Sequence, residues 1–205
     1  MPWFRRPPST RADPALPALV QDVERAVGIK GQKVLVVGEA SGDLATLLKR
    51  AGARKATAHS PVRGPRGDLP QNPFPMSRLP YKDGTFDLVV AHHALSGTSD
   101  LEGGLRDLLR VTRPGGHLFA ASFASDAPAH VVQRRLDAAP RSARERLLAH
   151  LSDGLDAEAV SDAMASLAGH GHVSLLDDGP HPELMEKWGA AMDHAVSYRM
   201  VAERG

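Results

Sequence analysis

The sequence predicts a three-layer α/β fold with a mostly parallel sheet and one antiparallel strand. The first observation is an apolar run, 34–37, that ends at Gly38 and is followed by leucines at helical spacing. The run does not alternate apolar with polar residues, so both faces of this strand should be buried, as in a parallel sheet. The second observation is a similar run at 86–91, followed by a helical pattern and another strand. Strands that alternate with helices in this way predict βαβ units.

Length and composition limit the possibilities. A chain of 205 residues fits one domain with a proper core. We expect a flexible basic tail over 1–12 and a single domain over 13–205 with a helical insertion at about 126–170. The net charge of +1 provides no strong field toward nucleic acid, and cysteine is absent. With no apolar stretch of membrane-spanning length, the sequence predicts a cytoplasmic protein without a transmembrane segment.

The first elements are set by helix and turn signals. Asp13-Pro14 is typical of a helix start, and an apolar face then runs to a stop at Gly28. After the first strand, Gly38 and Gly42 enclose a turn in which backbone can approach a ligand closely. The spacing does not fit the dinucleotide-binding fingerprint, since the position for its third glycine holds Asp43.

A short second strand follows over 53–60 and brings His59 to its carboxyl end. Residues 61–78 are rich in proline and glycine, so we expect a loop without a regular helix. In the next segment, Asp83-Gly84 predicts a turn and 86–91 a buried strand, with Asp87 capping neighbouring backbone. His92 and His93 follow that strand at the edge where open α/β sheets bind ligands, so either is a candidate general base or a pocket-wall residue.

The second half continues the pattern. A helix is predicted over 100–111, and Pro114 with two glycines turns the chain into a strand. Helical segments with breaks near Pro140, Gly154 and Gly169 follow. We then expect a strand over 172–178, a helix over 182–195 and a last strand over 197–204.

Two motifs resemble the class I S-adenosylmethionine-dependent methyltransferases, of the methyltransferase type 11 kind. The segment 79–95, from Leu79-Pro80 through Phe86-Asp87 to His93-Ala94-Leu95, is similar to one family signature. The segment 110–123, with its Pro114-Gly115-Gly116 turn, is similar to another. The glycine turn resembles the family's first motif in shape. The resemblance implies a Rossmann-like methyltransferase fold over about 20–125 and, more loosely, 172–204.

The resemblance also assigns a cofactor pocket, in which this chain departs from the family pattern. Val36, His59 and Pro75 stand where the family usually has acidic residues, and Ala40 replaces a glycine. Glu39 adds a carboxylate where the family places the carboxylate of the cofactor. A neutral imidazole has one acceptor, so His59 cannot accept hydrogen bonds from both ribose hydroxyls. The cofactor-binding candidates are Gly38, Glu39, Ala40, Gly42, His59, Met76 and His92.

These departures favour a methyltransferase-fold protein with a degraded S-adenosylmethionine site. Such a pseudo-methyltransferase would act as a scaffold, regulator or subunit through protein contacts, with no cofactor required. The alternative is an active methyltransferase on a small molecule or lipid, which uses S-adenosylmethionine. That reaction needs only in-line placement of the substrate nucleophile, so no catalytic residue is assigned. No nucleic-acid partner and no metal site are expected.

Overall fold

A computed structural model describes residues 15–38, 40–59, 79–95, 100–123, 173–175 and 197–205, and a few isolated residues between 133 and 167. Three helices are described: α1 (Ala15–Val27), α2 (Ser41–Arg50) and α3 (Leu101–Val111). The strands are β1 (Lys33–Gly38), β2 (Lys55–His59), β3 (Phe86–His92), β4 (Thr112–Phe123), β5 (Val173–Leu175) and β6 (Ser197–Glu203). The predicted tail, the loop 61–78, the helix 182–195 and most of the interval 126–170 lie outside the described residues. No helix in the described ranges combines the length and apolarity needed to cross a membrane.

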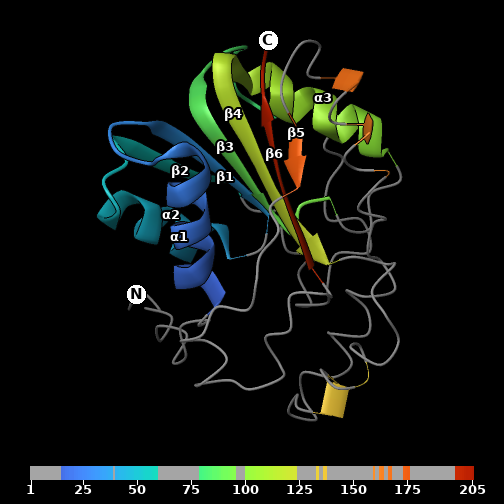
Figure 1. Cartoon of the computed structure of the whole chain (residues 1–205). Coiled ribbons are helices and arrows are strands. Elements are labelled where there is room, and N and C mark those ends of the chain that lie inside the picture. Colours follow the sequence, from blue (N-terminus) through green and yellow to red (C-terminus); the bar gives the residue numbers. More distant parts are fainter. Residues whose placement is uncertain are drawn as a thin grey trace, which may run out of the picture.

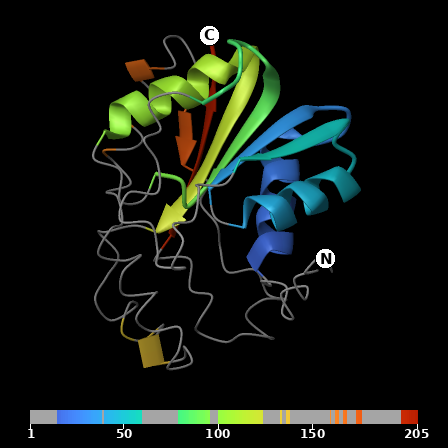
Figure 2. The same cartoon turned by 180° about the vertical axis from the view of Figure 1, so that it is seen from behind.

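The sheet has the predicted character. Its order is β2-β1-β3-β4-β6-β5. The pairs β1–β2, β1–β3 and β3–β4 are parallel, while β6 runs antiparallel to both β4 and β5. Helices α1 and α2 cover one face of the sheet and α3 covers the other, which gives three layers (Figures 1 and 2). The expected mostly parallel sheet with one antiparallel strand is therefore confirmed.

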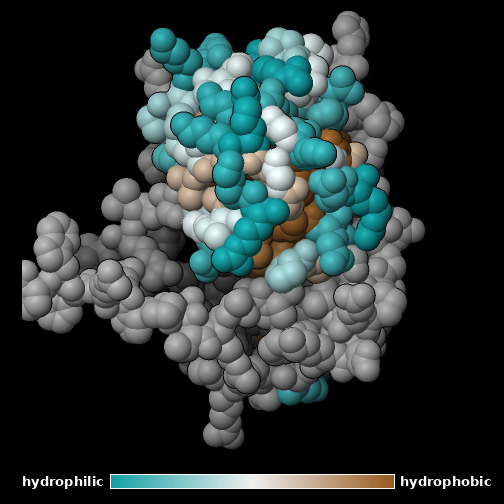
Figure 3. Space-filling model, turned by 90° about the vertical axis from the view of Figure 1, so that its left-hand side faces the viewer, coloured by the Kyte–Doolittle hydropathy of each residue, from teal (hydrophilic) through white to brown (hydrophobic). Residues whose placement is uncertain are grey.

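Two apolar clusters fill the spaces between the layers. One lies between the sheet and α3 and includes Leu35, Val89 and Leu105, and the helical residues Ala163 and Leu167 pack against it. The other lies between the sheet and helices α1 and α2 and includes Val23, Val36 and Leu48. Figure 3, seen from the side of β2 and α2, shows apolar atoms in brown beneath a largely hydrophilic surface. Strands β1 and β3 contribute to both clusters, which explains why their sequences do not alternate.

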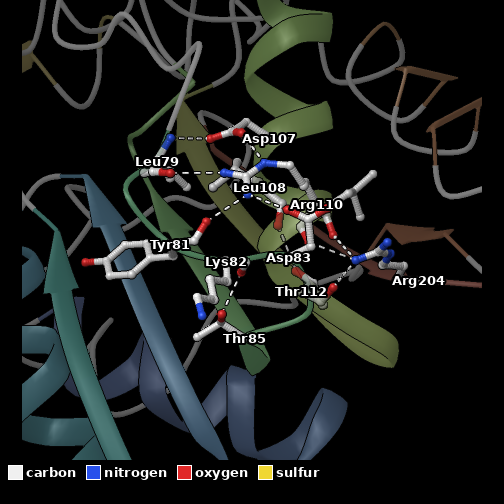
Figure 4. Close-up of polar contacts among 11 residues, drawn as sticks. Leu79, Tyr81, Lys82, Asp83, Thr85, Asp107, Leu108, Arg110, Thr112 and Arg204 are labelled. Atoms are coloured by element: carbon white, nitrogen blue, oxygen red, sulfur yellow. Dashed lines mark hydrogen bonds and ion pairs between the residues drawn. The ribbon is translucent and has the colours of Figure 1, made fainter.

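The segment before β3 is tied to α3 by Arg110 (Figure 4). Its guanidinium donates to the carboxylates of Asp107 and Asp83, at 2.7 Å each, and to the carbonyls of Leu79 and Tyr81. Asp107 in turn accepts from the backbone N–H of Leu79 at 2.5 Å. These bonds raise the pKa of Arg110, first through Asp107 and then through Asp83. A planar five-donor group is well suited to join so many acceptors.

Asp87 has the capping role predicted for it. One carboxylate oxygen accepts from the backbone N–H of Lys33 at 2.7 Å, and the other accepts from Arg113 at 2.7 Å. Burial acts to raise the pKa of Asp87, but the Lys33 N–H and the charges of Arg113 and Arg54 outweigh it and hold that pKa below its usual value. Asp87 therefore joins the starts of β1 and β3 to the start of β4.

The carbonyls at the end of α3 are capped from the chain's last residues. Arg204 donates to the carbonyl of Leu109 at 3.0 Å, to that of Arg110 at 2.9 Å and also to that of Thr112. The N–H of Gly84 donates to the Arg110 carbonyl as well. Helix carbonyls without an intrahelical partner need such donors.

We predict that Arg110→Met lowers the free energy of unfolding by roughly 2–3 kcal/mol, because it leaves the buried Asp107 carboxylate without its charged partner. Urea unfolding followed by circular dichroism measures this. The control is Arg106→Met, which removes only an exposed i,i+4 pair with Glu102. That control should change stability by about 0.5 kcal/mol or less. Equal effects of the two substitutions would show that the Arg110 contacts contribute nothing specific.

We also predict a pH-dependent effect of Asp87→Asn. A carboxyl whose folded-state pKa is lowered stabilises the protein above its usual pKa of about 4, and this contribution is lost as the pH falls. The stability difference between wild type and Asp87→Asn should therefore be largest near neutral pH and shrink below about pH 4. Urea midpoints over that pH range measure it. Arg113→Ala should weaken the pH dependence, and a difference that stays constant with pH would contradict the assignment.

Candidate functional site

The carboxyl ends of β1, β2 and β3 meet at one edge of the sheet. In the parallel register, Val37 pairs with His59 and Gly38 pairs with His92. Three of the residues singled out in the sequence therefore end neighbouring strands. This is the edge at which open parallel sheets bind ligands.

Gly38 is required by close packing between two strands. Its φ is +110°, and a Cβ there would lie 2.0 Å from the carbonyl oxygen of His92 and 3.1 Å from the Cβ of Ala94. A side chain would thus need both a rare backbone conformation and a displaced strand. The glycine allows the chain to leave β1 while it remains packed against the end of β3.

The turn that follows leads directly into α2. Ala40 precedes the helix with φ 49° and ψ 21°, the left-handed conformation that the family pattern fills with glycine, and its side chain provides no cap. The N–H of Leu44 donates to the Ala40 carbonyl at 2.9 Å and begins the helix. Ser41 is buried, whereas a Cβ on Gly42 would meet no atom of the described residues within 4 Å. The first turn of α2 is therefore open to close approach at Gly42.

His59 ends β2 and packs on an aromatic side chain. Its ring meets Tyr81 edge to face with centroids 5.9 Å apart, and Tyr81 meets Phe86 in the same way at 5.0 Å. Burial lowers the pKa of His59 and raises the pKa of Tyr81, so both side chains are neutral at neutral pH. The neutral imidazole has one acceptor nitrogen. The sequence did not indicate a contact for Tyr81, because this residue lies in the loop before β3 and meets His59 only in the folded chain.

His92 and His93 lie together at the end of β3. The His92 side chain is buried, and the centroids of the two rings are 4.3 Å apart. His93 has φ +49°, which is uncommon for a residue with a side chain, and its N–H donates to the Ala121 carbonyl at 2.8 Å. This bond to β4 helps to hold the strained residue. For both histidines, the roles of general base and of pocket-wall residue stay predictions, since no described contact distinguishes the two.

The remaining candidates are placed differently. Glu39, Met76 and Pro75 lie outside the described residues. Val36 is fully buried in the cluster beneath α1 and α2. Within the described part of the chain, no three metal-ligating side chains come together. For the remaining residues, the absence of a metal site stays a prediction.

S-adenosylmethionine fits the first turn of α2, at Gly42, better than it fits the end of β2, at His59. At Gly42 the bare backbone leaves the space that a Cβ would occupy, next to helix N–H groups that suit a carboxylate. At the end of β2, His59 offers one acceptor where two hydroxyls need two. The backbone at Gly42 therefore suits this cofactor better than the His59 side chain does.

Residues 37–120 match a family described as a methyltransferase domain. Among curated proteins, the demethylmenaquinone methyltransferase of Mycolicibacterium vanbaalenii is 40% identical over 62 residues, which are 30% of this chain and 27% of that protein. The enzyme of the same name from Corynebacterium urealyticum is 33% identical over 99 residues, which are 46% of this chain and 43% of that protein. The matches therefore span less than half the length of these relatives.

The fold is shared with solved structures at low sequence identity. A methyltransferase dependent on S-adenosylmethionine from Mesorhizobium loti gives a TM-score of 0.61 at 16% identity, over 93% of this chain and 96% of that chain. The [4+2]-cyclase SpnF gives a TM-score of 0.60 at 19% identity, over 93% of this chain and 80% of that chain. At these identities the likeness establishes the fold, which agrees with the predicted three-layer architecture.

We predict that Ala40→Gly stabilises the protein, since glycine adopts a left-handed conformation without the cost that a Cβ adds. The gain should be about 0.5–1 kcal/mol after the larger entropy loss of glycine on folding. Urea unfolding measures it. Ala51→Gly is the matched control, because Ala51 at the end of α2 has φ −73° and gains nothing from glycine. Destabilisation by both substitutions would contradict the assigned strain at Ala40.

Proposed function

We propose that this protein, whose residues 37–120 match a family described as a methyltransferase domain, keeps the methyltransferase scaffold with a weakened cofactor site. It acts in the cytoplasm as a non-catalytic subunit, scaffold or regulator through protein contacts. The observation that carries the proposal is His59, a neutral, half-buried imidazole at the end of β2.

The expected loss of affinity follows from hydrogen-bond chemistry. A carboxylate at the end of β2 could accept from both ribose hydroxyls, whereas His59 accepts from one at most. A hydrogen bond to a charged group contributes about 1.5–3 kcal/mol, so the loss corresponds to about one to two orders of magnitude in affinity. The His59 ring also packs edge to face against Tyr81.

The other changes act in the same direction. Ala40 holds a strained conformation that glycine would adopt freely. Val36 belongs to the apolar core and provides no polar group toward the edge. By contrast, the contacts that build the scaffold, at Asp87, Arg110 and Gly38, are intact. A preserved scaffold with altered ligand contacts supports a role that depends on shape more than on the cofactor.

A protein partner is compatible with this fold. One structural neighbour, with a TM-score of 0.54 at 16% identity, is a putative methyltransferase in complex with the Haloferax volcanii Trm112 methyltransferase activator. Three segments are candidate partner surfaces: the tail with Trp3 and Phe4, the loop 61–78 and the interval 126–170, which lie mostly outside the described residues. Ala163 and Leu167 of the last interval pack against the core beside α3.

The second candidate function is an active methyltransferase on a small molecule or lipid. The open backbone at Gly42 and the names of the curated relatives favour it. S-adenosylmethionine would supply the methyl group, and two structural neighbours contain S-adenosylhomocysteine. The chain's own task would be to hold the two reactants in line and exclude water, which is mainly a proximity effect. His92 or His93 could take a proton from the substrate.

Titration calorimetry with S-adenosylmethionine and S-adenosylhomocysteine decides between these functions. We expect wild-type affinity weaker than about 10 μM, or −7 kcal/mol, and stronger binding by Ala40→Gly/His59→Asp. Wild-type binding at or below that value would overturn the proposal and support the enzyme.

The control variant is Gly42→Ala. Among the described residues its Cβ meets no atom within 4 Å, so the fold should tolerate it, while a ligand lying against the first turn of α2 would lose its place. If the double variant gains affinity and Gly42→Ala in that background removes it, the ligand lies at the turn. No gain in the double variant would show that His59 and Ala40 are not what weakens the site.

A further inference from the structure

The opposite edge of the sheet, where the parallel strands begin, gathers basic side chains. We call this surface the basic edge and define it by Lys30, Lys33, Arg54, Lys55 and Arg113. Four of these residues are exposed and Lys33 is half-buried. The loops before β1 and before β2 are joined by backbone hydrogen bonds. The N–H of Gly31 donates to the Gly52 carbonyl at 2.9 Å, and the N–H of Arg54 donates to the Gln32 carbonyl at 2.8 Å. The basic edge is therefore a fixed surface built from several segments.

Helix ends do not account for this charge. Lys49 and Arg50 lie in the last turn of α2, where cations favour the helix dipole, and Lys49 donates to the carbonyls of Ala53 and Arg54. The five residues of the basic edge lie on strands and in loops, outside the last turns of the helices. The flanking pairs Arg110–Asp83 and Arg25–Asp22 compensate their own charges.

The register places two of the cations side by side. Lys33 is the partner of Lys55 across the parallel pair β1–β2, so the two side chains share one face of the sheet. Like charges in such neighbouring positions are destabilising. The Lys33 ammonium lies 5.2 Å from the centroid of the Phe86 ring, while Lys55 has no ion pair with any described residue. An added anion would relieve this repulsion.

The basic edge already binds one carboxylate. Asp87 lies between Arg113, at 2.7 Å, and Arg54, at 3.8 Å. Both arginines remain at least half exposed, at 50% and 69% of their side chains, so they keep donors directed to solvent. The guanidinium fork fits carboxylates in planar geometry.

We propose that the basic edge is a docking surface for an acidic, aspartate- or glutamate-rich segment of a partner protein. Charge complementarity carries the choice of partner. A nucleic acid is less favoured, because the whole chain has a net charge of only +1 and no aromatic side chain is among the five residues that could stack on a base. A membrane is less favoured because these residues offer no apolar anchor.

This inference says what kind of partner the proposed non-catalytic role would use. It rests on the proposed function for the biological role of the contact, whereas peptide binding itself does not require that function. The basic edge lies at the opposite end of the strands from Gly38 and His59. Peptide binding and cofactor binding should therefore succeed or fail independently.

The test uses the full chain and a fluorescein-labelled decaglutamate peptide, followed by fluorescence anisotropy at about 10 mM salt, where the Debye length is about 30 Å. We expect saturable binding that disappears at about 1 M salt, where that length is about 3 Å. Lys30→Glu and Lys55→Glu should each weaken binding about fivefold or more, as expected when a charge in a complementary surface is reversed.

Arg106→Glu is the matched control, since it changes the net charge equally at an exposed position of α3 and should have little effect. Equal weakening by all three variants, or no peptide binding at low salt, would overturn the proposal. A decathymidylate oligonucleotide or phosphatidylglycerol vesicles provide the comparison. If either binds more tightly than the peptide and with the same sensitivity to Lys55→Glu, the surface serves that class of partner and the proposal is wrong. Thermal unfolding of each variant confirms that it is folded.

Discussion

The close contact between Gly38 and the carbonyl of His92 sets the geometry of the carboxyl edge. With no Cβ in the way, β1 and β3 stay paired to their last residues, and the chain can turn at once into α2. The ends of β2 and β3 then bring His59 and His92 to the same edge. Each feature of the candidate site depends on these strands ending in register.

Polar contacts at the other end hold the same register. Asp87 binds the first N–H of β1 and the Arg113 side chain, so one carboxylate joins the starts of β1, β3 and β4. Arg110 and Arg204 then connect the loop before β3, the end of α3 and the end of β6. The scaffold is thus stabilised by charged groups whose partners come from distant parts of the sequence.

The two edges of the sheet differ in charge partly because helix dipoles favour opposite charges at the two ends of each helix. In a fold of parallel strands and covering helices, the helices begin at the carboxyl edge and end at the amino edge. Acidic residues in first turns, such as Asp43 and Glu102, and basic residues in last turns follow from the helix dipole. The basic edge exceeds that pattern, because strand and loop positions add further cations. A ligand edge and a separate partner surface can therefore coexist on one domain.

For the described residues, the sequence by itself determined the order of helices and strands, the buried strands, the Gly38 turn and the backbone-capping role of Asp87. It could do so because burial and turn conformation depend on the residues of one short segment. Only the tertiary structure decided that Tyr81 packs on His59, that Ala40 and His93 take left-handed conformations, and that Lys33 lies beside Lys55. These features depend on how segments distant in sequence, both strands and the turns and loops between them, pack against one another, and the residue pattern of one segment does not specify that packing.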